Sequence, residues 1–214
     1  LHASLLPQYR GAAPINRAIM NGETETGVTT FLLNHEIDKG AILAQERMPI
    51  LPDDNVGTLY DKLMHAGTKL VTDTVDRIAA GDVTPIEQQH IDESTLRPAP
   101  KIFKEDCRID WTQQGSAIVN LIRGLSPYPA AWTTLRREDG GEETTAKIFK
   151  ARFEPTAHGA APGTVESDCR TFVRAACADG WIALEELQIA GKKRLPVRDL
   201  LLGWRDVLQY RFGE

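Results

Sequence analysis

The chain has 214 residues, of which 42% are hydrophobic, 26% charged and 7% aromatic. This composition is typical of a globular protein and excludes an intrinsically disordered one. No run of apolar residues reaches the roughly 18 to 20 needed to cross a bilayer, and the first residues lack the basic and apolar regions of a signal peptide. We therefore expect a cytoplasmic protein without a membrane partner.

The cysteine content and the charge exclude further classes of protein. The three cysteines, Cys107, Cys169 and Cys177, show no Cys-x-x-Cys spacing, so neither a disulfide framework nor a thiolate zinc site is supported. The formal net charge of −5 is unevenly divided, with −6 on residues 1–100 and +1 on residues 101–214. This balance argues against coating by nucleic acid but leaves room for a local basic face on the second half.

Residues 14–50 predict a short helix followed by two strands. Pro14 suits the first turn of a helix, and Asn21-Gly22 ends it. β-Branched and apolar residues then predict strands at 27–33 and 42–50, which could pair as a hairpin.

A long helix is predicted at residues 58–80, because apolar residues recur there with helical spacing. The apolar stripe consists of Leu59, Leu63, Ala66, Leu70, Val71, Val75 and Ile78. Residues 86–91 predict a short edge strand, and the proline-containing segment 92–103 predicts a linker. We therefore expect one domain at residues 1–91 and a second at residues 104–214.

The second half predicts a small β-barrel. Strand-like runs recur at residues 132–135, 146–153, 163–166, 171–177 and 181–189. Short strands separated by glycine-containing turns favour a barrel of the oligonucleotide-binding (OB) type.

Short helices are expected in the second half around residues 116–123 and 197–202. Trp132 and Trp181 are expected in the barrel core rather than as platforms on which bases stack.

A candidate catalytic pair lies at the ends of two expected strands. If the chain up to His2 ends a parallel strand and a crossover helix leads to the next parallel strand at 27–33, both strands finish at the same edge of the sheet. That edge would bring His2 beside Asp38, although 36 positions separate them. A carboxylate beside an imidazole orients the ring and favours its charged form, which suits the pair for proton transfer.

Several stretches resemble a known family. They are His2-Ala3-Ser4-Leu5-Leu6-Pro7, Arg10-Gly11, Ile37-Asp38-Lys39-Gly40, Arg108-Ile109-Asp110-Trp111 and Leu125-Ser126-Pro127-Tyr128-Pro129. Together they closely resemble the folate-dependent formyltransferases, and within them the methionyl-tRNA formyltransferases, over nearly the whole chain. The resemblance implies an α/β protein, namely the C-terminal portion of a Rossmann-like formyltransferase domain followed by an OB-like β-barrel domain.

The resemblance also implies roles for individual residues. His2 and Asp38 match the family's catalytic histidine and aspartate. The segment that lines the tetrahydrofolate site is matched by Ser4, Leu5, Leu6 and Pro7. The family's third catalytic group, an asparagine two positions before the histidine, would fall outside this chain together with the first strands of the domain, so we expect the 214-residue chain alone to be inactive.

The implied reaction transfers a formyl group from 10-formyltetrahydrofolate to the α-amino group of methionyl initiator tRNA, without a metal ion. No protein partner is implied, and a monomer is expected for the complete protein. Arg10 and the basic loop Lys192-Lys193-Arg194 are candidates for contacts with tRNA phosphates. Arg10 could equally pair with a carboxylate, and the loop could simply be solvated.

Other functions remain open at this point. A related formyltransferase could act on a UDP-amino sugar, and a related hydrolase could act on 10-formyltetrahydrofolate with the same His2 and Asp38. A non-catalytic RNA-binding fragment is an alternative of another class. We also expect the strands at 27–33 and 42–50 to need cover for their edges, either from the rest of a longer protein or from self-association.

Overall fold

The computed structural model describes residues 1–88, 92–141 and 143–213. Contacts divide the chain into two compact units, Leu1–Ile102 (unit 1) and Phe103–Glu214 (unit 2). Among the described residues, no helix combines the length and apolar composition that a membrane span requires.

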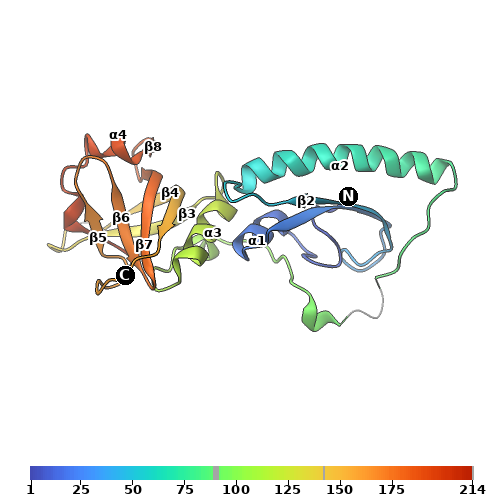
Figure 1. The fold of residues 1–214 in the computed structure, drawn as a ribbon, viewed down its shortest axis with the longest axis horizontal. Helices are drawn as coiled ribbons and strands as arrows, with labels where there is room; N and C mark the ends of the chain where they lie inside the picture. Colours follow the sequence, from blue (N-terminus) through green and yellow to red (C-terminus); the bar gives the residue numbers. More distant parts are fainter. Residues whose placement is uncertain (89–91, 142, 214) are drawn as a thin grey trace. The chain divides into compact units, whose positions relative to one another are not determined.

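Unit 1 contains a β-hairpin and two helices (Figure 1). Helix α1 (Pro14–Met20) leads into strands β1 (Glu25–Phe31) and β2 (Ile42–Pro49), which pair antiparallel, and helix α2 (Val56–Ala79) contacts both strands. The predicted hairpin and both predicted helices are confirmed, with boundaries close to those expected from the sequence.

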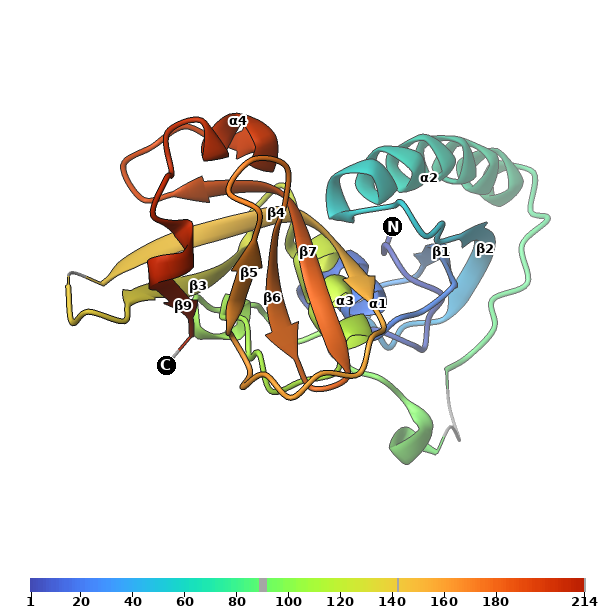
Figure 2. The same cartoon turned by 60° about the vertical axis from the view of Figure 1, so that its left-hand side comes forward.

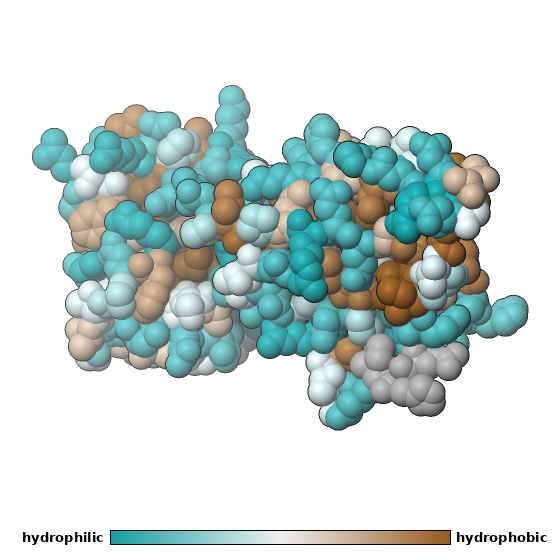
Figure 3. All heavy atoms as spheres, turned by 45° about the vertical axis from the view of Figure 1, so that its right-hand side comes forward, coloured by the Kyte–Doolittle hydropathy of each residue, from teal (hydrophilic) through white to brown (hydrophobic). Residues whose placement is uncertain are grey.

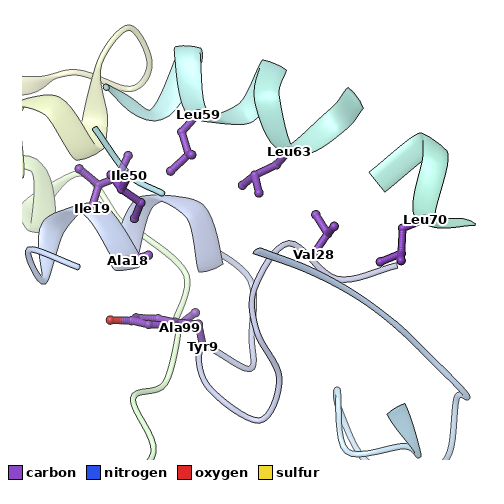
Figure 4. Packing of buried hydrophobic residues seen from close by; sticks show 9 residues of the cluster. All are labelled: Tyr9, Ala18, Ile19, Val28, Ile50, Leu59, Leu63, Leu70 and Ala99. Carbon is purple, nitrogen blue, oxygen red and sulfur yellow. The ribbon is translucent and has the colours of Figure 1, made fainter. Parts of the chain in front are cut away.

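The core of unit 1 lies between the helices and the hairpin (Figure 4). It is formed by Tyr9, Ala18, Ile19, Val28, Ile50, Leu59, Leu63, Leu70 and Ala99. The outer part of the predicted stripe on α2 is not buried, since Val71, Val75 and Ile78 are 38%, 57% and 51% exposed. The buried line of α2 consists of Leu59, Leu63, Leu70 and Thr74, so the rest of unit 1 covers one edge of the stripe and leaves the other exposed.

Helix α2 begins at a capping box. The Asn55 side chain accepts the backbone N–H of Thr58, and the Thr58 hydroxyl accepts the backbone N–H of Asn55. The neighbouring Asp54 is buried and accepts hydrogen bonds from the Leu51 backbone and from Lys62 Nζ at 2.7 to 2.8 Å. Burial alone would raise the pKa of Asp54, but these hydrogen bonds outweigh it and the pKa is lowered.

The first residues of the chain meet β1 in the opposite sense to the predicted one. His2 and Thr29 exchange two backbone hydrogen bonds of 2.8 and 2.9 Å in an antiparallel bridge. The predicted parallel crossover is therefore wrong. The loop after His2 stays beside β1, where Leu6 N donates to Thr29 Oγ1, so the chain has already turned back before it enters α1.

The segment expected to be a linker packs against unit 1. Ala99 is fully buried, its backbone N–H donates to the Arg10 carbonyl, and its own carbonyl accepts the Ala13 N–H. The flanking prolines hold this backbone extended, which suits it to such edge pairing. Of the predicted strand at 86–91, Ile86 forms a single bridge with Ile42, and residues 89–91 lie outside the described residues.

Unit 2 is a seven-stranded antiparallel sheet curved into a nearly closed barrel (Figure 2). Its strands are β3 (Ala131–Arg137), β4 (Thr144–Glu154), β5 (Val165–Ser167), β6 (Val173–Cys177), β7 (Gly180–Ile189), β8 (Leu195–Pro196) and β9 (Tyr210–Phe212). They follow the order β5-β6-β7-β4-β3-β9, with β8 beside β7. A bridge between Thr164 and Arg211 joins the two ends of this order.

Helices complete unit 2 outside the sheet. They are α3 (Gly115–Leu125) and α4 (Val197–Leu201), with the 3-10 turns η2 (Glu105–Cys107) and η3 (Val207–Gln209); unit 1 holds η1 (Glu93–Thr95). The five predicted strands and two predicted helices are confirmed, whereas β8 and β9 were too short to be predicted. Trp181 is buried as expected, but Trp132 is only partly buried.

Candidate active site

The imidazole of His2 lies in unit 1 beside the loop that follows it. Nε2 is 2.8 Å from the carbonyl oxygen of Tyr9, and because a carbonyl only accepts, Nε2 carries a hydrogen. Nδ1 faces the carboxylate of Asp38, with 3.7 Å between Nδ1 and Oδ2. The structure therefore brings His2 and Asp38 together, as predicted, and leaves Nδ1 as the ring atom that can exchange a proton with a ligand.

The carbonyl that holds His2 is itself fixed. Tyr9 adopts a φ of 59°, and its buried side chain donates a hydrogen bond from the hydroxyl to Glu23 and accepts one from Asn21 Nδ2. Burial, helped by Glu23, raises the pKa of the Tyr9 hydroxyl. The aromatic ring thus anchors the loop, and the backbone oxygen of the same residue sets the orientation of the imidazole.

Asp38 is held by backbone and side-chain donors. Asp38 Oδ2 accepts a hydrogen bond of 2.9 Å from the Gly11 N–H. The backbone of Asp38 has a φ of 56°, in the left-handed region that aspartate tolerates. Gln88 Nε2 donates to the carbonyl oxygens of Asp38 and Gly40 at 2.9 and 2.7 Å, while Gln88 Oε1 accepts from the Arg10 guanidinium at 2.9 Å. Gln88 therefore joins the two loops that carry the catalytic candidates.

Sequence reasoning did not find Gln88, because its position depends on a long loop whose path no pattern predicts. It did single out Arg10, but for contact with RNA. The structure instead places Arg10, which is partly buried, against Gln88, so its clear contact is within the site.

The four residues expected to line the folate site differ in burial. Ser4 and Leu6 are buried, and Ser4 Oγ donates to the Gln8 carbonyl at 2.6 Å. Leu5 and Pro7 are partly exposed. Ser4 and Leu6 thus shape the loop, while Leu5 and Pro7 offer apolar surface to a ligand.

Thr29 on β1 and Gln45 on β2 hold this loop through hydrogen bonds. The buried Thr29 hydroxyl donates to the Ser4 carbonyl at 2.6 Å and accepts from Leu6 N and Gln45 Nε2. Gln45 Nε2 also donates to the Leu6 carbonyl at 2.8 Å. Sequence reasoning missed both residues, although a polar residue in the middle of a buried strand is a signal that could have pointed to Thr29.

An apolar hollow of about 490 Å³ lies on the other side of the first residues. Leu1 and Ala3 line it together with α2 residues that include Met64. Because neighbouring side chains of an extended segment point to opposite faces, the hollow is separate from the His2 imidazole. Apolar surface also interrupts the polar surface of unit 1 in Figure 3, where it appears brown.

The basic loop in unit 2 is less uniform than its sequence predicts. Arg194 donates to Glu186 at 2.6 Å and lies 4.0 Å from the centroid of the Phe149 ring. Lys192 and Lys193 are exposed. Only the two lysines of the loop therefore present charge that no carboxylate among the described residues neutralises.

The remaining candidates for chemistry are structural. Cys107, Cys169 and Cys177 form no disulfide bond, and burial raises the pKa of Cys177, which keeps it protonated. Within the part of the chain that the structure describes, no group of three His, Cys, Asp or Glu side chains is arranged to hold a metal ion.

Comparison with known proteins identifies the family. A family model described as "Formyl transferase" matches residues 1–75, and one described as "Formyl transferase, C-terminal domain" matches residues 101–205. The chain belongs to the formyl transferase family. The first match lies within unit 1, and the second lies almost wholly within unit 2.

Curated relatives are similar over the whole chain. The methionyl-tRNA formyltransferase of Parabacteroides distasonis is 50% identical over 215 residues, covering 100% of this chain and 66% of the relative. That of Bacteroides fragilis is 53% identical over 205 residues, covering 95% and 63%. The chain thus spans just under two thirds of the length of these relatives.

Solved structures of other proteins share the fold. HypX from Aquifex aeolicus in complex with tetrahydrofolic acid matches with a TM-score of 0.65 and 23% identity, over 94% of this chain and 34% of HypX. The N-formyltransferase from Helicobacter canadensis, in complex with folinic acid and dTDP-3-aminofucose, matches with a TM-score of 0.64 and 21% identity, over 91% and 65%. At these identities the likeness concerns the fold alone.

Proposed function

We propose that the chain is part of a methionyl-tRNA formyltransferase, which transfers a formyl group from 10-formyltetrahydrofolate to the α-amino group of methionyl initiator tRNA in translation initiation. The observation that carries the proposal is the 3.7 Å approach of His2 Nδ1 and Asp38 Oδ2 across 36 positions of sequence. The relatives that are about half identical and bear this name support the choice of substrate.

The reaction is an acyl transfer between two nitrogens. The free amine of methionine attacks the formyl carbon, and a new C–N bond forms while the carbonyl oxygen becomes an oxyanion. The bond between the formyl carbon and N10 of the folate then breaks. The proton lost from the amine moves to N10, so that formyl-methionine and tetrahydrofolate are the products.

His2 and Asp38 are assigned complementary roles in this reaction. Protonated His2 donates from Nδ1 toward the oxyanion, since its Nε2 is bound to the Tyr9 carbonyl. One such donor is worth roughly 2.7 to 4 kcal/mol of transition-state stabilisation. Asp38 holds the imidazolium and helps to move the amine proton toward the leaving nitrogen.

The substrates would meet the chain at different places. The partly exposed side chains of Leu5 and Pro7, next to His2, suit the flat face of a pterin ring, with Ser4 and Leu6 shaping the loop behind them. The tRNA would be held by unit 2, where Lys192 and Lys193 are exposed, and Arg194 and Arg10 would contribute less because each already has a side-chain partner.

We assign unit 1 to the later part of a Rossmann-like catalytic domain and unit 2 to an OB-like barrel. The curved antiparallel sheet and its closing bridge between Thr164 and Arg211 support the second assignment. Because His2 and Asp38 come from one chain, a monomer suffices for the chemistry. We assign the enzyme to the cytoplasm, because its proposed product is used there in translation initiation.

The test compares acceptors, using the complete polypeptide that carries these residues. Formyl transfer from 10-formyltetrahydrofolate is measured onto methionyl initiator tRNA, onto a UDP-amino sugar and onto water. We expect efficient transfer only onto the tRNA. Transfer onto the amino sugar, or hydrolysis of the donor alone, would assign the site to another activity of the same family, and no formyl chemistry with any acceptor would leave an RNA-binding role.

A further inference from the structure

His2 and Asp38 are both held by the backbone of one short loop, residues 8–11. Tyr9 supplies the carbonyl oxygen that lies 2.8 Å from His2 Nε2, and Gly11 supplies the N–H that donates to Asp38 Oδ2 at 2.9 Å. Planar peptide groups link these two backbone atoms, so they do not move independently of each other. A shift of the loop therefore displaces the partner of the imidazole and the partner of the carboxylate together.

A segment far along the chain runs beside this loop. It consists of residues 95–99, which we call the clamp segment. The Tyr9 N–H donates to the Arg97 carbonyl at 2.7 Å, and the Ala99 N–H donates to the Arg10 carbonyl at 2.8 Å. Ala99 also forms a parallel bridge with Gly11. The clamp segment thus gives the loop the kind of backbone support that a neighbouring strand gives within a sheet.

The side chain of Gln8 adds two hydrogen bonds between the loop and the clamp segment. Gln8 Oε1 accepts the Arg97 N–H at 2.8 Å, and Gln8 Nε2 donates to the Thr95 carbonyl at 3.2 Å. The Gln8 carbonyl accepts a hydrogen bond of 2.6 Å from the hydroxyl of Ser4, which is buried. Gln8 therefore joins the segment that follows His2 to the clamp segment.

The loop and the clamp segment are in close contact at both ends. Ala99 is fully buried, and a Cβ atom on Gly11 would lie 2.4 Å from the Ala99 carbonyl oxygen. Gly11 also has a φ of 126°, which only glycine adopts readily. At the other end, the Arg97 guanidinium pairs with Glu23, and the same carboxylate accepts the Tyr9 hydroxyl at 2.6 Å. A displaced clamp segment would therefore leave the loop without its main neighbour.

We propose that Gln8 is a positioning residue for the catalytic pair and acts through the clamp segment. By tying the loop to this segment, Gln8 keeps the two backbone atoms that hold His2 and Asp38 in place. The proposal rests on the proposed function, which assigns the pair to catalysis. Since a small misplacement of a catalytic group costs much of its rate advantage, Gln8 affects the rate through the geometry of the loop rather than through contact with the reacting atoms.

The test uses the complete polypeptide that carries these residues. Gln8→Ala removes both side-chain hydrogen bonds to the clamp segment, whereas Gln8→Glu keeps an acceptor for the Arg97 N–H and loses only the donor to Thr95. Asp92→Ala is the matched control. It removes two hydrogen bonds that Asp92 accepts from Ser94, in the same stretch of chain but without a contact to the loop. Thermal melting checks that each variant is folded.

Two readouts are measured on these variants. The first is the kcat and the KM values of formyl transfer from 10-formyltetrahydrofolate to methionyl initiator tRNA. The second needs no substrate and follows the Nε2–H resonance of His2 by NMR in protein labelled with ¹⁵N-histidine, assigned by its loss in His2→Gln. A hydrogen-bonded N–H in a closed structure is protected from exchange with water, so the Tyr9 carbonyl should keep this resonance visible.

We expect Gln8→Ala to lower kcat by about 10-fold, to change both KM values by less than about 2-fold, and to broaden or remove the His2 resonance. Gln8→Glu should lie between wild type and Gln8→Ala in both readouts, and Asp92→Ala should match wild type.

Three results would overturn the proposal. An increased KM with an unchanged kcat would make Gln8 a substrate contact, an unchanged His2 resonance in Gln8→Ala would show that the loop holds its shape alone, and an equal loss in Asp92→Ala would indicate general loosening of the chain. If the resonance responds as expected but the wild type transfers no formyl group, the hold of Gln8 on His2 is supported and the proposed function is overturned.

Discussion

In unit 1, hydrogen bonds hold the His2 ring and the Asp38 loop in place, whereas in unit 2 the exposed side chains of Lys192 and Lys193 have no carboxylate partner among the described residues. The imidazole is held by the Tyr9 carbonyl and faces a carboxylate that is itself held by Gly11. Lys192 and Lys193 lie in an exposed loop of unit 2. A group that moves protons requires a fixed geometry, while a group that attracts phosphate needs only charge and proximity.

This contrast predicts that the two regions fail in different ways. Variants near His2 should lower kcat and leave tRNA affinity unchanged, and variants of Lys192 and Lys193 should do the reverse. The following experiments test that division, starting from the largest expected effect.

Replacing His2 with alanine should have the largest effect. Loss of a donor worth roughly 2.7 to 4 kcal/mol lowers kcat of the complete polypeptide by about 10²- to 10³-fold. Initial-rate assays with Met-tRNA measure kcat, and equilibrium binding on the same preparation measures tRNA affinity. Together they separate an effect on chemistry from an effect on binding. A variant that keeps its kcat would remove His2 from the mechanism.

Gln88→Ala should lower kcat by about 10-fold, because it removes two hydrogen bonds, each worth about 0.5 to 1.5 kcal/mol, that hold the Asp38 loop. Gln88→Glu keeps an acceptor for Arg10 but loses both donors, so it should be as slow as Gln88→Ala. Arg10→Ala is the matched control for the remaining contact. Equal rates for Gln88→Glu and wild type would show that the loop holds its shape without Gln88.

Asp54→Asn should destabilise unit 1 by about 1 to 2 kcal/mol at pH 7, since the carboxylate accepts charge-assisted hydrogen bonds. The folded pKa of Asp54 is lowered, so its stabilising contribution is complete above the unfolded pKa of about 3.9 and is lost as the pH falls through the folded value. Urea denaturation should therefore show the variant and wild type converging at acid pH. Asp38→Asn is the control, because Asp38 is assigned to catalysis. If the difference in unfolding free energy between wild type and Asp54→Asn stays the same at acid pH, this account is contradicted.

Lys192→Ala should have the smallest effect. Loss of one phosphate contact reduces the salt-dependence slope of tRNA binding by about 0.7 to 0.9 and leaves kcat at saturating tRNA unchanged. Titration at several KCl concentrations and saturating-substrate assays measure the two quantities. A lower kcat with an unchanged salt-dependence slope would contradict the proposal that unit 1 carries the chemistry and unit 2 binds the tRNA.

Much of the local structure follows from patterns in the chain. The hairpin of β1 and β2, the helices α1 and α2, and five of the strands in unit 2 were predicted because helical and strand periodicity are local properties. The proximity of His2 and Asp38 was also predicted, although by a parallel crossover that the antiparallel bridge to Thr29 replaces.

Contacts between distant residues could not be predicted in the same way. Gln88 reaches the Asp38 loop across 50 positions, and Arg194 pairs with Glu186. Tryptophan is a residue type that is often buried in a core, yet the register of Trp132 opposite Lys147 places it on the outer face. In each instance the partner is set by which strands and loops become neighbours.

The amino-acid sequence by itself determined the succession of elements in both halves and the residue types available for proton transfer. Apolar spacing and turn residues act over a few positions, so they can be recognised without a fold. Only the tertiary structure decided which ring nitrogen of His2 is available, which side of α2 is covered, and which cations lack a carboxylate. Those properties depend on neighbours brought together by chain reversal and strand register, and one residue of register moves a side chain to the opposite face.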